Sequence, residues 1–106
     1  MMNKEIHEKL LEILKIIDMI CKKEKLTYML DSGTLLGAIR EKGFIEWDDD
    51  ADIIMHRQDF EEFENKVPQY LQNSEFYFDY NDRVPKVCYK ENPQVRVDIF
   101  IIDIFR

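Results

Sequence analysis

The sequence has little of what nucleic-acid-binding and membrane proteins depend on. Lysine and arginine number 15 against 22 acidic residues, and there is no basic tract or basic amphipathic helix. This balance argues against a sequence-independent grip on nucleic acid and against a helix lying on a membrane surface. No apolar run approaches membrane-spanning length, and the charged N-terminus does not have the form of a signal peptide. We therefore expect a cytoplasmic protein without membrane insertion.

Cysteine, glycine and proline are also scarce. The two cysteines, Cys21 and Cys88, have no metal-ligand partner in a CxxC pair or a clustered histidine, so we expect buried, reduced thiols. Three glycines and three prolines in 106 residues, with 45% apolar side chains, are typical of a folded domain. The length leaves room for one core, so residues 1–106 are expected to form a single domain.

Hydrophobic periodicity gives the expected elements. Apolar side chains at helical spacing predict a helix over residues 4–24, and further helices are expected at 34–42 and 57–67, with Pro68 near the end of the last. Short β-prone or alternating runs predict strands at 26–30, 50–55, 76–80, 86–89 and 95–102. The order α-β-α-β-α-β-β-β predicts an α/β (α+β) fold, a mixed sheet flanked by helices.

The last predicted strand, residues 95–102, is followed by only four residues and no covering helix. We therefore expect a minimal core, truncated at the C-terminus, whose last strand has little to cover it. An exposed hydrophobic strand edge or sheet face favours association. A homo-oligomer formed through the uncovered sheet is accordingly one expected partner interaction.

The chemistry is concentrated in acidic residues. Asp48, Asp49, Asp50 and Asp52 lie within five positions. In a strand, residues i and i+2 point to the same face, so Asp50 and Asp52 project side by side. Asp98 is likewise an acid inside an apolar strand, and if the two strands pair, three carboxylates converge and need a cation. Oxygen ligands without histidine or cysteine favour Mg²⁺ or Mn²⁺.

Three other readings of these acids compete with a metal site. An EF-hand loop beginning at Asp48 fails, because its sixth position would be Ile53 where a glycine is required. A solvated acidic turn is commoner in general, but the apolar residues after Asp52 and Asp98 place both acids within buried strands. A helix N-cap explains one aspartate but not the set.

A turn at Ser32, Gly33 and Thr34 precedes the helix expected at 34–42. A helix that begins directly after a strand presents free backbone N–H groups and a positive dipole end, which suit phosphate oxygens. Gly33 permits close approach, and Ser32 or Thr34 supplies a hydroxyl. Alone this is a weak signal, since any capped helix looks the same. Coupled to a metal-binding strand, it suggests a site for a nucleoside diphosphate-type ligand.

These residues also carry a resemblance. The run DSGTLLGAIREKGFIEWDDDADIIM at 31–55, followed by VDIFIID at 97–103, closely resembles the LicD family of the nucleotidyltransferase superfamily. By position, it implies that Gly33 and Thr34 lie at the donor phosphates and that Asp50, Asp52 and Asp98 are the metal-binding, catalytic carboxylates. Arg40 matches as a charge near the donor, with a surface ion pair as the alternative. Asp48 and Asp49 match an acidic extension of uncertain role.

The resemblance implies the nucleotidyltransferase fold and a Mg²⁺-dependent transferase. Its activity would move a phosphocholine-type group from a CDP-linked donor, such as CDP-choline, to a hydroxyl of a cell-surface glycan such as lipopolysaccharide or teichoic acid. One alternative is a nucleotidyltransferase that attacks the α-phosphorus of a nucleoside triphosphate. Another is a catalytically silent nucleotide- or metal-binding module.

Overall fold

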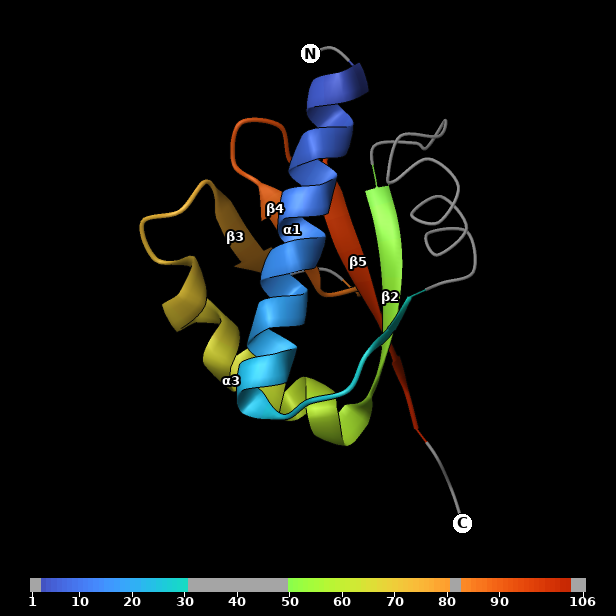
Figure 1. Ribbon diagram of the computed structural model, residues 1–106. Coiled ribbons are helices and arrows are strands. Elements are labelled where there is room, and N and C mark those ends of the chain that lie inside the picture. The colour runs from blue at the N-terminus through green and yellow to red at the C-terminus, as the bar shows by residue number, and fades with distance from the viewer. Residues whose placement is uncertain (1–2, 31–49, 81–82, 104–106) are drawn as a thin grey trace.

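The computed structural model of the chain describes residues 3–30, 50–80 and 83–103 (Figure 1). Helices and strands follow in the order α1 (Asn3–Glu24), β1 (Met29–Leu30), β2 (Asp50–His56), α3 (Arg57–Leu71), β3 (Phe76–Asp79), β4 (Lys86–Tyr89) and β5 (Arg96–Ile102). Helices and one five-stranded sheet confirm the α+β class and every predicted strand, although β1 is shorter than expected. The helix expected at 34–42 lies outside the described residues.

The sheet is mixed, with the strand order β1-β2-β5-β4-β3. β2 and β5 are parallel, whereas β1 with β2, β5 with β4, and β4 with β3 are antiparallel. A parallel pair needs a crossover connection, which α3 and the β3–β4 hairpin supply here. The last strand in sequence is therefore the central strand of the sheet.

This central position corrects only part of the expectation that residues 95–102 have little to cover them, because β5 is not an edge but one of its faces keeps exposed apolar side chains. β5 has hydrogen-bonded neighbours on both sides, so it is not an edge. Its side chains Val97 and Ile99 are buried in the core cluster beneath the helices. Phe100 and Ile102, which alternate with them, are 44% and 37% exposed. Association through this sheet stays a prediction.

Both described helices cover the same face of the sheet. Figure 1 shows α1 lying across the strands, and buried side chains of α1 and α3 join those of β2, β4 and β5 in one core. Ile13, Ile17 and Phe63 are fully buried there, as are Ile53 and Val87 of the sheet. Neither α1 nor α3 covers the opposite side, called here the open face. The alternating residues of each strand point to it.

The two helices end in different ways, α1 at Glu24 as predicted and α3 later than predicted. α1 ends where Lys25 adopts a left-handed φ of 59°, and the Leu26 amide donates to the Cys21 carbonyl at 2.7 Å, as in a Schellman motif. α3 continues past Pro68 to Leu71, so the expected end near Pro68 is wrong. Val67 and Leu71 are buried, and their packing holds the last turn despite the proline. Neither described helix is long and apolar enough to cross a membrane.

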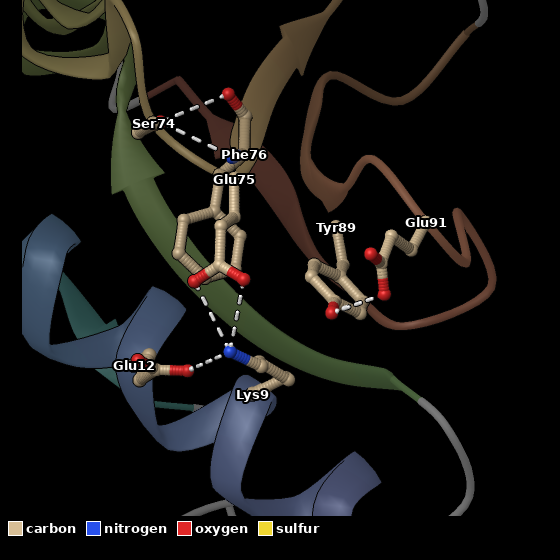
Figure 2. Close-up of polar contacts among 7 residues, drawn as sticks. All are labelled: Lys9, Glu12, Ser74, Glu75, Phe76, Tyr89 and Glu91. Carbon is tan, nitrogen blue, oxygen red and sulfur yellow. Dashed lines mark hydrogen bonds and ion pairs between the residues drawn. The ribbon is translucent and has the colours of Figure 1, made fainter. Parts of the chain in front are cut away.

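A polar cluster links α1 to the β3–β4 edge of the sheet (Figure 2). The Lys9 ammonium lies 3.1 Å from Glu12 Oε2 and 3.1 Å from Glu75 Oε2, and 5.3 Å from the centroid of the Tyr89 ring. Hydrogen bonds to Glu12 and Glu75 raise the pKa of Lys9. The lysine therefore ties α1 to the turn before β3 and to the end of β4.

Both cysteines are buried and free, as predicted. Cys21 lies in the helix-covered core, and burial raises the pKa of its thiol to about 12. Burial also raises the pKa of Cys88, which alternates with core residues of β4 and so belongs to the open face. In the folded protein both thiols are held in the protonated form near neutral pH.

We expect Cys21→Ala to flatten the loss of stability at alkaline pH. An unfolded thiol titrates near ~8.5, whereas the folded one keeps its proton to about 12. The contribution of Cys21 is thus complete below a pH of about 8.5, and above it the free energy of unfolding falls by about 1.4 kcal/mol per pH unit. Urea denaturation at several pH values measures this slope. Ile20→Val, a neighbouring core change without a titratable group, should keep the wild-type slope, and an unchanged slope in Cys21→Ala would contradict the assignment.

Candidate active site

The candidate site is built on the pairing of β2 with β5. The register places the Cα of Asp52 opposite that of Asp98, and the Cα of Asp50 opposite that of Arg96. Adjacent strands lie about 4.8 Å apart, so the two opposed carboxylates share one level of the sheet. Ala51, Ile53, Val97 and Ile99 point into the core. Asp52 and Asp98, which alternate with them, therefore point to the open face and form what is called here the carboxylate pair.

One basic side chain contacts this pair, and a second basic residue is its neighbour in the sheet. Arg96 Nε lies 3.1 Å from Asp98 Oδ1, and the two side chains are 32% and 13% exposed. Lys86 of β4 is the Cα partner of Asp98 on its other side. Crowded carboxylates repel one another. Arg96 offsets part of this repulsion through its contact with Asp98, and the acidic run at 48–52 alone does not reveal that contact.

Sequence reasoning missed Arg96, although its signal was present. Arg96 stands two residues before Asp98 in a predicted strand, so both side chains had to share a face. Its Nη1 also donates to the Gln94 carbonyl at 3.3 Å, which fixes the guanidinium beside the carboxylate. Lys86 had no comparable signal, because only the register of β4 against β5 places it beside Asp98.

The other predicted site residues are placed in part or not at all. Asp50 begins β2, but its side chain lies outside the described part of the structure. Ser32, Gly33, Thr34, Arg40, Asp48 and Asp49 also lie outside the described residues. β1 ends at Leu30, opposite Ile53 of β2 and therefore next to the level of Asp52. The predicted phosphate turn follows directly after this strand in the sequence.

The donor set suits a hard divalent cation. Across residues 3–30, 50–80 and 83–103, no group of three or more histidine, cysteine or acidic side chains could hold a metal. The carboxylate pair nevertheless offers oxygen ligands from two rigid strands. Mg²⁺ is usually bound through one or two carboxylates, with water and substrate phosphates completing the shell. The residues present therefore fit Mg²⁺ or Mn²⁺ held together with a phosphate ligand.

A separate hollow of about 590 Å³ lies between α1 and β1. Its lining is mainly apolar, with Leu11, Leu14, Tyr28 and Leu30 among the residues. Neither member of the carboxylate pair lines it. Its lining also includes Lys15, Lys22 and Lys23, but the hollow is separate from the carboxylate pair and is therefore not part of the candidate site.

The part of the chain that contains β2 and β5 is similar to known proteins. Residues 25–105 match the model of the nucleotidyltransferase domain shared by LicD, FKTN and FKRP. The chain belongs to the LicD family. The matched range includes both β2 and β5, and with them the carboxylate pair. The resemblance carried by the Gly-Thr turn and the aspartates is thereby confirmed at the level of the family.

Three curated relatives extend this match. The lipopolysaccharide cholinephosphotransferase LicD of Haemophilus influenzae is 34% identical over 110 residues, covering 88% of this chain and 41% of that protein. Uncharacterized proteins of Rickettsia typhi and Rickettsia prowazekii are 38% and 33% identical, covering 59% and 88% of this chain and 20% and 33% of theirs. The chain thus spans less than half the length of each of these relatives.

We expect Arg96→Gln to destabilise the metal-free protein by about 1–3 kcal/mol. Asp98, which is 13% exposed, would lose a charged donor, and its repulsion with Asp52 would be less well offset. Urea denaturation in the presence of a chelator measures the effect. Arg57→Gln is the matched control, because Arg57 Nε pairs with Asp103 Oδ1 at 2.6 Å with side chains 52% and 40% exposed. An equal loss in both variants would show that the Arg96–Asp98 pair is no stronger than a surface pair.

Proposed function

We propose that this domain binds the donor and the metal in a LicD-type transferase. The reaction moves a phosphocholine-type group from a CDP-linked donor to a hydroxyl of a cell-surface glycan and depends on Mg²⁺ or Mn²⁺. The observation that carries the proposal is the carboxylate pair, aligned at one level of adjacent parallel strands within the family-matched range. The similarity to a lipopolysaccharide cholinephosphotransferase supports the substrate class.

In this proposal, Asp50, Asp52 and Asp98 hold the metal, which when bound acts as a Lewis acid that neutralises charge on the donor diphosphate. The strands of the sheet keep Asp52 and Asp98 in place, so little reorganisation is needed when the donor arrives. Asp98 either completes the ligand set or accepts the proton of the attacking hydroxyl. The glycan oxygen forms a bond to the β-phosphorus while the bond from that phosphorus to the CMP oxygen breaks.

The donor phosphates are proposed to lie on the turn at Ser32, Gly33 and Thr34, with Arg40 as a nearby charge. The support is positional, because β1 ends at Leu30 beside the level of the carboxylate pair. Backbone N–H groups at a helix start suit phosphate oxygens. A donor held between this turn and the metal would present its β-phosphorus to an acceptor approaching over the open face.

We expect Mg²⁺ or Mn²⁺ to raise the melting temperature of the protein. A ligand at a hundred times its dissociation constant adds about 2.7 kcal/mol to the free energy of unfolding. Asp50→Asn combined with Asp52→Asn should abolish the rise measured by thermal shift. Glu61→Gln combined with Glu62→Gln removes the same charge from the exposed side of α3 and should leave the rise intact. A full response in the aspartate double variant would place the metal elsewhere.

Product analysis tests the reaction itself. With CDP-choline, Mg²⁺ and a lipopolysaccharide acceptor we expect CMP and a phosphocholine-bearing glycan, and Asp98→Asn should slow CMP release by about 100-fold or more. Asp103→Asn, at an exposed carboxylate beyond β5, serves as the control. Pyrophosphate released from a nucleoside triphosphate would instead identify a nucleotidyltransferase. Donor and metal binding without either product would identify a catalytically silent module.

A further inference from the structure

Arg96 occupies a distinctive position among the charged residues of the open face. It lies opposite Asp50 on β2 and two residues before Asp98 on its own strand. Its Nε donates to Asp98 Oδ1 at 3.1 Å. The arginine therefore begins at the level of Asp50, and its guanidinium reaches the level of the carboxylate pair.

Arg96 is paired with Asp98, which in the proposed function binds a divalent cation. A divalent cation at Asp98 would compete with the guanidinium for carboxylate oxygens, because both are cations seeking the same lone pairs. The arginine side chain is 32% exposed and Asp98 only 13%, so the guanidinium is the more accessible member of the pair, although it also donates to the Gln94 carbonyl. Arginine binds phosphate as readily as carboxylate, and with the same donor geometry.

We propose that Arg96 is a donor-binding residue that exchanges partners: it pairs with Asp98 in the ligand-free protein and with a phosphate of the donor once a divalent cation occupies the carboxylates. The inference rests on the proposed function and adds a residue to it. In the ligand-free state the arginine positions Asp98 and offsets its charge. In the loaded state the same positive charge acts on the diphosphate, within reach of the metal.

This exchange predicts effects of opposite sign on two ligands. Without donor, the guanidinium repels the metal and competes for Asp98, so removing it should tighten metal binding. With metal present, the guanidinium attracts the donor phosphates, so removing it should weaken donor binding. A residue that only supports the fold would weaken both.

The test measures Mn²⁺ binding by electron paramagnetic resonance in the absence of donor, and CDP-choline binding by calorimetry at saturating Mn²⁺. For Arg96→Gln we expect a Mn²⁺ dissociation constant about ten-fold lower and a CDP-choline dissociation constant about ten-fold higher. Arg96→Lys keeps the positive charge but not the planar array of donors, so both constants should lie between those of wild type and those of the glutamine variant. Arg96→Met, of similar length, replaces the glutamine variant if that one does not fold.

Arg57→Gln is the matched control, because it breaks another arginine–aspartate pair at the opposite end of β2 and β5. It should change neither constant. If wild type binds both ligands but the glutamine variant shifts neither, or weakens both, the exchange is wrong and the proposed function stands. If wild type binds neither Mn²⁺ nor CDP-choline, the proposed function and the exchange both fall.

Discussion

The parallel pairing of β2 with β5 is the constraint on which the rest of the structure depends. Ile53 and Ile99 are opposite one another and buried beneath the helices, and Asp52 and Asp98 are opposite one another on the other side. A slip of one residue would carry the apolar side chains of one strand out of the core and its acids into it. The core therefore selects the register, and the register aligns the acids.

This coupling makes the site depend on contacts between residues that are far apart in sequence. β5 follows the β3–β4 hairpin in sequence but lies between β2 and β4 in the sheet. Contacts of such long sequence separation carry a loop-closure cost that local elements avoid. Until β5 is in place, Asp52 has neither Asp98 nor Arg96 beside it. The same strand pairing therefore supplies both the carboxylate pair and the central core contacts.

Local sequence patterns are sufficient to predict the helices and strands but not the order of the strands in the sheet. The helix over α1 followed from apolar spacing, and the faces of Asp52 and Asp98 followed from the two-residue period of a strand. Strand order does not follow from period or propensity, since it is decided by which apolar faces fill one core. That is why β5 was expected to be uncovered and Lys86 was not foreseen. The passage of α3 through Pro68 is a similar case, because buried Val67 and Leu71 override a local helix-ending signal.

The mixture of charges on the open face bears on the kind of ligand it suits. A site for a bare divalent cation gains nothing from nearby arginine and lysine, since both repel it. A site for a bare phosphate gains nothing from aspartates. Asp52 and Asp98 beside Arg96 and Lys86 suit a ligand that carries both signs in a fixed arrangement, as a metal–diphosphate does. In the ligand-free protein Arg96 pairs with Asp98, so part of the acidic charge is already offset on a rigid sheet before a ligand arrives.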